Sequence, residues 1–141
     1  MFAVRKAVKK DFPRIHALDV VCEGVRLADG EHTWREWIAH AEVWVAERGR
    51  KLLGAVVLFP TKRGDWHLHK IFVRPRYRHR GIGSALLAKA LPALRGKRIF
   101  LTVYPGFPGA VHLYKKFGFR IKRLERGYYR KSEPRYVMER A

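Results

Sequence analysis

A basic, glycine-containing segment at residues 78–87 constrains the fold of this chain more than any other stretch. It follows a predicted strand, Trp66 to Val73, and begins a predicted helix whose apolar residues recur every three or four positions from Ile82 to Leu94. Gly81 and Gly83 allow the backbone to turn tightly and to come close to a ligand. Because the N–H groups of a first helical turn have no partner within the helix, they attract anions. The segment therefore predicts a phosphate-binding loop between a strand and a helix.

Two motifs in the second half of the chain resemble those of the GNAT superfamily of N-acetyltransferases. Arg78, Gly81 and Gly83 match the Q/R-x-x-G-x-G/A pattern that wraps the pyrophosphate of coenzyme A in that family. The segment from Ala110 to Phe119 is similar to the family's A-x-x-L-Y-x-x-x-G-F signature. The resemblance extends from about Trp66 to Met138, and the N-terminal part matches only in its pattern of elements. It implies an acetyl-CoA-dependent N-acetyltransferase.

The order of predicted elements is typical of the GNAT fold. Strands are predicted at residues 2–5, 42–48, 51–59, 66–73, 98–103, 119–124 and 135–139, and helices at 12–23, 31–41, 82–96 and 108–116. Asp11 and Thr33 are the predicted N-caps of the first two helices. Pro92 is expected to bend the last turn of the third helix, which Gly96 ends.

The resemblance implies an α/β (α+β) fold with a single mixed central sheet of about seven strands and helices on both faces. In the GNAT fold, strands four and five run parallel and splay apart at one end. The pantetheine arm of the cofactor fills the gap between them as an extra strand would.

Length and composition limit the organisation of the chain. Its 141 residues predict a single domain covering 1–141. No apolar run is long enough to span a bilayer, so we expect no membrane attachment. The single cysteine, Cys22, excludes internal disulfides and fits a reducing compartment, which predicts a cytoplasmic protein. We expect a monomer or a homodimer.

The formal net charge of +19 is far larger than a cofactor pocket requires. Such a charge attracts polyanions through a long-range, salt-sensitive field, so non-specific association with nucleic acid or with the ribosome is one interpretation. A solvated basic surface without a specific partner is the other. The scattering of Lys and Arg along the whole chain weakens the first interpretation.

The resemblance to GNAT enzymes implies acetyl-CoA (coenzyme A) as cofactor and assigns two groups of residues to it. Backbone contacts with the pantetheine arm fall on Ile71, Phe72 and Val73, and the N–H near Val73 would polarise the thioester carbonyl. Contacts with the pyrophosphate fall on the loop and the first helical turn, which comprise Arg78, His79, Arg80, Gly81, Ile82, Gly83 and Ser84.

Acetyl transfer to an amine requires a base for the amine and an acid for the departing thiolate. Tyr114 matches the tyrosine that protonates the sulfur of CoA in many members of the family. The alternative is a core tyrosine that packs against Phe117 and Phe119.

The base is less clearly marked. Thr102 stands where ribosomal-protein N-terminal acetyltransferases carry a glutamate, and Phe107 corresponds roughly to their asparagine in the next loop. Residues 67–73 instead resemble the H-L-H-x-L-A-V run of arylalkylamine N-acetyltransferases, whose two histidines lead protons away through water. The spacing of His67 and His69 places both rings on one strand face. A proton relay, two satisfied histidines of a half-buried strand and a metal pair are the alternatives, and we expect no metal site.

Two features of the sequence point to different acceptors. Tyr128 and Tyr129 resemble the paired tyrosines with which N-terminal-peptide acetyltransferases hold their substrate. Trp34 lies in the predicted second helix, near the usual acceptor cleft, and allows an aromatic amine, although it may equally belong to the core. A small amine and a protein N-terminus both remain open as substrates. A basic RNA- or ribosome-associated module with this fold, and a CoA-binding protein without catalysis, are the alternative functions.

Overall fold

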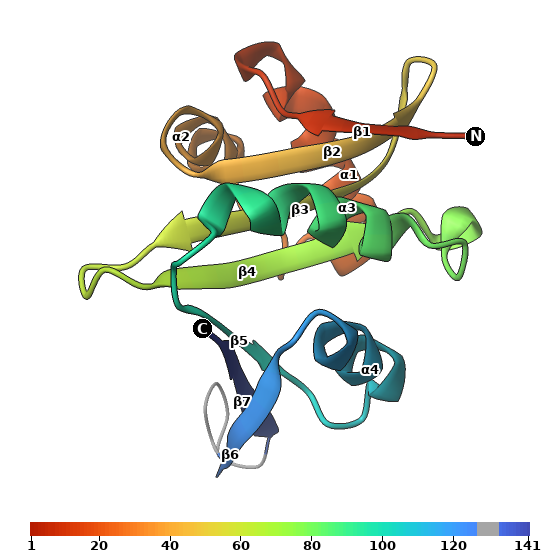
Figure 1. Ribbon diagram of the computed structural model, residues 1–141. Helices are drawn as coiled ribbons and strands as arrows, with labels where there is room; N and C mark the ends of the chain where they lie inside the picture. The colour runs from red at the N-terminus through yellow and green to blue at the C-terminus, as the bar shows by residue number, and fades with distance from the viewer. Residues whose placement is uncertain (127–132) are drawn as a thin grey trace. The chain divides into compact units, whose positions relative to one another are not determined.

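The structure is a computed structural model of the 141-residue chain, and it describes residues 1–126 and 133–141 (Figure 1). The strands are β1 (Ala3–Lys6), β2 (Glu42–Arg48), β3 (Lys51–Pro60), β4 (Trp66–Val73), β5 (Ile99–Val103), β6 (Arg120–Arg126) and β7 (Pro134–Arg140). The helices are α1 (Phe12–Glu23), α2 (Glu31–His40), α3 (Ile82–Ala90) and α4 (Pro108–Lys116), with short 3-10 helices η1 (Lys9–Asp11), η2 (Pro75–Tyr77) and η3 (Leu91–Leu94). The predicted order of elements is confirmed.

The described strands form one mixed sheet of seven in the order β1-β2-β3-β4-β5-β7-β6. Strands β1 and β2, β2 and β3, β5 and β7, and β6 and β7 pair antiparallel. Strand β4 pairs parallel with β5, with Trp66 opposite Ile99 and His67 opposite Phe100. The predicted fold class, with strands four and five parallel, is therefore confirmed.

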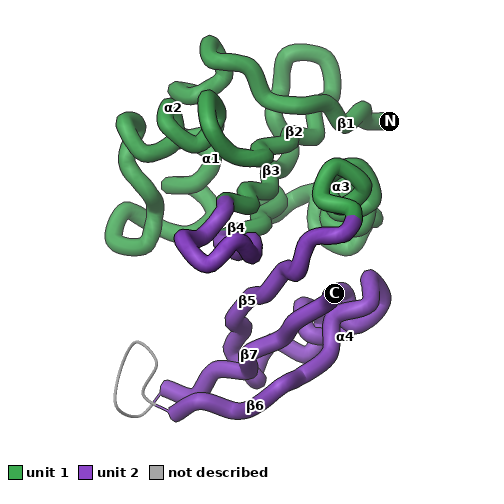
Figure 2. Tube along the Cα trace, turned by 60° about the vertical axis from the view of Figure 1, so that its left-hand side comes forward, with its two compact units in different colours: residues 1–59, 70–95 green, residues 60–69, 96–141 purple. Residues whose placement is uncertain are grey.

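The chain divides into two compact units (Figure 2). Unit 1 comprises residues 1–59 and 70–95, and unit 2 comprises residues 60–69 and 96–141. Strand β4 contributes its first four residues to unit 2 and its last four to unit 1.

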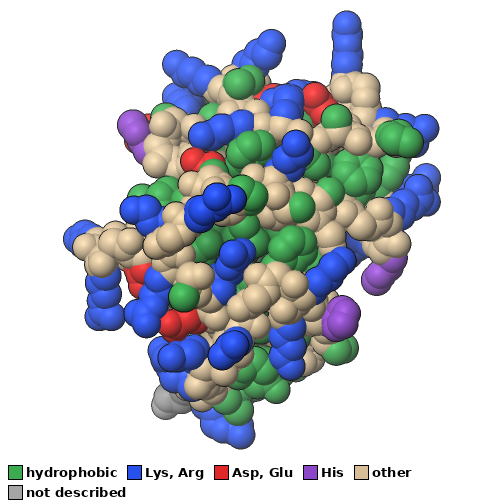
Figure 3. Space-filling model, viewed as in Figure 1, with side chains coloured by type: hydrophobic (Ala, Val, Ile, Leu, Met, Phe, Trp, Pro, Cys, Tyr) green, Lys and Arg blue, Asp and Glu red, His purple; other side chains and the backbone are tan. Residues whose placement is uncertain are grey.

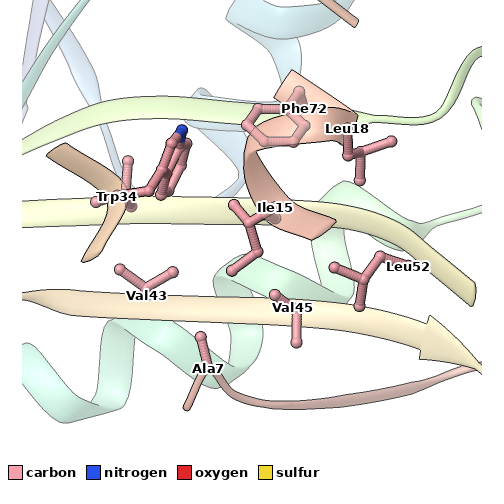
Figure 4. Packing of buried hydrophobic residues seen from close by; sticks show 10 residues of the cluster. Ala7, Ile15, Leu18, Trp34, Val43, Val45, Leu52 and Phe72 are labelled. Atoms are coloured by element: carbon pink, nitrogen blue, oxygen red, sulfur yellow. The ribbon is translucent and has the colours of Figure 1, made fainter. Parts of the chain in front are cut away.

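Unit 1 has a core between its strands and the helices α1 and α2. Figure 4 shows Ile15 and Leu18 of α1 and Trp34 of α2 gathered with Val43 and Val45 of β2. Phe72 of β4 also belongs to this cluster, and its ring lies edge-on to Trp34 at a centroid distance of 6.0 Å. Helix α3 lies on the other side of β3 from α1 and α2 (Figures 1 and 2).

A glycine on β3 allows α3 and β4 to pack closely. A Cβ atom at Gly54 would lie 2.8 Å from the carbonyl oxygen of Phe72 and 3.3 Å from Cγ2 of Ile82. Gly54 is therefore required by space rather than by backbone conformation. This contact fixes the start of α3, and with it the preceding loop, against strand β3.

Unit 2 combines the β5-β7-β6 ladder with α4. Leu101 pairs with Met138, and both side chains are buried. Tyr114 of α4 and Phe119 are buried too, with their rings edge-on at 5.9 Å. The predicted helix at 108–116 is confirmed at both ends.

Three local predictions have different outcomes. Helix α2 begins at Glu31 with Gly30 as its N-cap, so the prediction of Thr33 as the cap was wrong. Asp11 does precede α1, but its side chain accepts hydrogen bonds from Arg5, Arg14 and the Val8 N–H instead of capping that helix. At Pro92 the α-helix has already given way to the 3-10 helix η3. This is expected because proline has no N–H to donate to a helical hydrogen bond.

Candidate active site

The loop between β4 and α3 has the backbone of an anion-binding turn. After η2, His79 adopts a φ of 63° and Gly81 a φ of 81°. His79 is the only non-glycine residue with positive φ in the described parts of the chain. Left-handed residues thus stand on both sides of Arg80, and backbone turns that contain such residues form anion-binding nests in many proteins. Gly81 is the N-cap of α3.

The first turn of α3 offers backbone donors to a ligand. The first hydrogen bond of the helix runs from the Ala85 N–H to the Gly81 oxygen at 3.0 Å. Within the described residues, no backbone acceptor takes the N–H groups of Ile82, Gly83 and Ser84. Gly81 has no side-chain cap, and the first turn carries no acidic residue. An anion can therefore meet these N–H groups and the positive end of the helix together.

Two arginines of the loop are turned back toward β4 and η2. The Arg78 Nε donates to the carbonyl oxygen of Val73 at 2.9 Å, so the structure brings these two predicted cofactor residues together. The guanidinium of Arg80 lies over the ring of Tyr77 at 5.5 Å from its centroid. His79 and Arg80 are exposed. The loop is thus basic and anchored to the end of the strand.

The three β4 residues assigned to the pantetheine arm differ in side-chain environment. Phe72 is buried in the core of unit 1, whereas Ile71 and Val73 are half-buried. The Val73 oxygen also lies 3.5 Å from the sulfur of Cys22. Burial raises the pKa of the Cys22 thiol, although the charge of Arg78 opposes this, and a raised pKa disfavours the nucleophilic thiolate form.

Unit 2 carries the candidate acid and base. Tyr114 is buried against Phe119, which satisfies its alternative interpretation as a core residue while leaving a role as acid open. The rings of His67 and His69 lie 5.7 Å apart, and His67 stacks on Phe100 at 4.7 Å. Burial, and secondly the neighbouring charge of His69, lowers the pKa of His67 to about 4. His67 is therefore neutral at physiological pH.

The sequence profile of the acetyltransferase (GNAT) family matches residues 4–119. The chain belongs to the GNAT family of acetyltransferases. The matched range includes residues of both units.

Curated relatives of this GNAT chain match it over about half of its length. It is 35% identical over 83 residues to an N-alpha-acetyltransferase of Sulfurisphaera tokodaii, covering 56% of this chain and 50% of that protein. It is 39% identical over 77 residues to the N-alpha-acetyltransferase RimI of Mycobacterium tuberculosis, covering 54% of this chain and 49% of that protein. The chain thus spans about half the length of these relatives.

Solved structures share the fold of this GNAT chain. The ribosomal-protein-S18-alanine N-acetyltransferase of Escherichia coli superposes with a TM-score of 0.84 at 21% identity, covering 99% of this chain and 92% of that one. Naa50 of Arabidopsis thaliana, in complex with the bisubstrate analogue CoA-Ac-MVNAL, gives 0.80 at 23% identity, with coverage of 99% and 98%.

The remaining predicted site residues of this GNAT chain have different positions. Trp34 is fully buried, and its indole N–H donates to Asp19 at 3.0 Å, which fits the alternative interpretation of this residue as part of the core. Thr102 is half-buried on β5, and Phe107 is exposed at the N-cap of α4. Tyr128 and Tyr129 lie outside the described residues. No group of three or more metal-ligating side chains occurs in the part of the chain that the structure describes.

A largely buried ion-pair cluster around Lys70 was not predicted from the sequence. The Lys70 Nζ lies 3.0 Å from Asp19, 2.9 Å from Asp29 and 3.0 Å from the carbonyl oxygen of Leu27. Burial alone would lower the pKa of Lys70, but hydrogen bonds to Asp29 and Asp19 raise it. The cluster ties β4 to α1 and to the segment between α1 and α2.

Proposed function

We propose that the protein is an acetyl-CoA-dependent N-acetyltransferase and that residues 1–141 act as one catalytic domain. The observation that carries this proposal is the loop before α3. Its left-handed residues, basic side chains and available N–H groups fit a pyrophosphate, and it coincides with the cofactor motif of the family to which the chain belongs. Membership of that family argues against the two alternatives, a nucleic-acid module and a CoA-binding protein without catalysis.

Two groups of residues in unit 1 would bind different parts of the cofactor. The N–H groups of Ile82, Gly83 and Ser84 would hold the pyrophosphate, with Arg78, His79, Arg80 and Gly81 completing the loop around it. The backbone of Ile71, Phe72 and Val73 would pair with the pantetheine arm, and the Val73 N–H would stabilise the oxyanion.

The chemistry is a direct attack in a ternary complex. The amine nitrogen would form a bond to the acetyl carbonyl carbon, and the carbon–sulfur bond to CoA would break, releasing CoA as the thiol. Tyr114 supplies a proton to the departing thiolate. His67 and His69 accept the proton of the amine, directly or through water, because an ammonium group cannot attack while charged, and the reference pKa is about 8 for an α-amino group and about 10.4 for a lysine-like amine.

A protein or peptide N-terminus is the favoured acceptor. Both curated relatives described above are named N-alpha-acetyltransferases, and this favours an α-amino group. A small arylalkylamine is the second candidate, supported by the neighbouring rings of His67 and His69.

The cellular setting follows from simple features of the chain. No helix in the described residues is long and apolar enough to cross a membrane. Cys22 has no disulfide partner, which fits the cytoplasm. The charge of +19 gives the enzyme a non-specific attraction to nucleic acid and ribosomes. The proposed oligomeric state is a monomer or a homodimer.

The proposal is tested by a matched pair of glycine variants. Gly81→Val strains a backbone with φ of 81° and obstructs the loop, whereas Gly64→Val strains a backbone with φ of 92° in the turn at 61–65. Calorimetry with acetyl-CoA should show binding by wild type and Gly64→Val and none by Gly81→Val. Thiol release should then be followed with N-terminal peptides, arylalkylamines and polyamines. Unchanged affinity in Gly81→Val would refute the phosphate-loop interpretation, and binding without thiol release from any amine would refute the activity.

A further inference from the structure

We propose that a pocket on unit 1, outside the phosphate-binding loop, binds a second phosphate-rich anion of nucleotide size. The pocket, called here the basic pocket, is lined by five cationic side chains from three separate segments. These are Arg14 of α1, Arg48, Arg50 and Lys51 of the β2–β3 hairpin, and Arg74 at the end of β4. None of residues 78–84 lines it.

The shape and lining of the basic pocket suit a small anion. Its volume is about 520 Å³, within the range of small-molecule sites. Ala17, Leu18, Val21 and Leu52 supply apolar surface, and none of its nine lining residues is acidic. Five positive charges therefore line an open pocket, and within the described residues only Arg14 of the five is paired with a carboxylate, that of Asp11.

Two of the arginines are held in place by the backbone. Arg14 donates through Nη1 to the carbonyl oxygen of Arg50 at 2.7 Å and through Nη2 to Asp11 at 2.9 Å. Arg74 donates through Nε and Nη2 to the carbonyl oxygen of Leu52 at 3.0 and 2.9 Å. A guanidinium has five donors, so Arg14 and Arg74 are fixed in orientation and still have donors for a ligand.

The hairpin supplies the remaining charge. Arg48, Arg50 and Lys51 are exposed, and among the described residues the side chains of Arg48 and Arg50 make no hydrogen bond or ion pair. The Lys51 ammonium lies over the ring of Tyr77 at 5.5 Å. These three cations can close over a ligand without breaking an existing ion pair, so their desolvation is the main cost.

This arrangement favours phosphate over other anions. Arginine forms paired hydrogen bonds with phosphate oxygens, and four of the five cations are arginine. A polyphosphate carries several negative charges within the width of the pocket, whereas the charges of an acidic peptide are spread over a longer chain. No aromatic side chain lines the pocket, so it lacks the stacking platform on which single-stranded RNA is bound.

Tyr77 lies beside both anion sites. Lys51 of the basic pocket and Arg80 of the phosphate-binding loop each lie over its ring at 5.5 Å. The basic pocket could therefore hold a distal phosphate of CoA itself instead of a separate ligand. The test must occupy the loop with CoA first and then ask for a second site.

The experiment measures binding of inorganic tripolyphosphate to the full chain saturated with CoA, at about 150 mM salt, where exposed charges are largely screened. Wild type should bind one tripolyphosphate. The variant Arg48→Gln/Arg50→Gln/Lys51→Gln should bind it at least about tenfold more weakly, because it loses three charge-assisted contacts. The matched control, Lys89→Gln/Arg95→Gln/Lys97→Gln, removes three exposed cations that do not line the pocket and should bind as wild type does.

A single substitution gives an independent check. Val21 is an exposed residue of the pocket lining on α1, and Val21→Glu places a carboxylate among the five cations. It should abolish tripolyphosphate binding while leaving CoA affinity within about twofold, because it does not alter the loop.

Three outcomes would overturn the proposal. If CoA prevents all tripolyphosphate binding, the basic pocket belongs to the cofactor site. If the pocket variant and its control lose affinity equally, the effect is that of a general polycation. If the pocket variant loses affinity for an RNA oligonucleotide but binds tripolyphosphate as before, the ligand class is wrong. Failure of CoA to bind would refute the proposed function instead, and tripolyphosphate binding without CoA would then still measure the pocket.

Discussion

His67 is a titratable candidate whose surroundings change its chemistry. Burial lowers its pKa to about 4, and the neighbouring charge of His69 is the second cause. A general base acts in its deprotonated form, so its contribution rises with pH through its pKa. For a histidine with the unperturbed pKa of about 6.5, the rate would rise with pH near neutrality. Because the pKa of His67 is lowered to about 4, the rise in rate that depends on His67 should instead lie near pH 4.

The pH profile of kcat/KM can separate the two histidines. His67→Gln should lower turnover about 100-fold, the usual size of a general-base contribution, and remove the limb near pH 4. His69→Gln should move that limb upward, toward about 6.5, because it removes the charge that opposes protonation of His67. A double variant with the turnover and pH profile of wild type would exclude the relay.

Tyr114 is tested as an acid by removing a single oxygen atom. Tyr114→Phe keeps the packing against Phe119, so acetyl-CoA affinity should stay close to wild type. Turnover should fall by about 100-fold if the hydroxyl protonates the thiolate. Tyr104→Phe is the matched control, since Tyr104 is exposed beside Phe107. Equal turnover in the Tyr114 variant and its control would leave solvent as the acid.

The seating of α3 depends on the missing side chain of Gly54. Gly54→Ala places a Cβ 2.8 Å from the carbonyl oxygen of Phe72, so α3 or β4 must shift. We expect the free energy of unfolding to fall by about 1–3 kcal/mol, as in other overpacked cores, when measured by denaturant titration. Gly30→Ala is the control, because a Cβ there has no neighbour within 4 Å. A Gly54 variant as stable as its control would show that α3 adapts without cost.

The order of the elements was predictable because local rules decide it, whereas some bounds were not, since α3 ends at Ala90 instead of Gly96. The β2–β3 hairpin follows from apolar strands around Gly49, which adopts a φ of 61°, and the phosphate-binding loop follows from its glycines. Tertiary contacts decide the rest. The only polar atom of the Trp34 side chain is the indole nitrogen. Its N–H donates to the buried Asp19, and this hydrogen bond allows the whole side chain to be buried. The basic pocket combines cations from three distant segments, so no sequence window contains it.

The whole molecule carries an excess of positive charge that its ion pairs do not neutralise. There are 31 Lys and Arg residues against 12 Asp and Glu. Lys and Arg side chains project over all of the face seen in Figure 3, where acidic side chains are few. The buried carboxylates of Asp11 and Asp19 already form ion pairs with neighbouring Lys and Arg side chains. Burial would raise the pKa of Asp11, but hydrogen bonds from Arg5, the Val8 N–H and Arg14 lower it to about 2. Repulsion among the remaining cations therefore opposes folding.

Screening this repulsion should stabilise the protein. We expect the Tm to rise between about 10 and 300 mM NaCl, because salt weakens the many repulsive pairs more than the few attractive ones. The variant Lys89→Glu/Arg95→Glu/Lys97→Glu lowers the net charge of +19 by six at exposed positions. It should have a higher Tm than wild type at low salt and a weaker dependence on NaCl. If its Tm is lower at low salt, or if the Tm of wild type falls as NaCl is added, local ion pairs outweigh the net charge, and the basic surface then contributes to stability instead of opposing it.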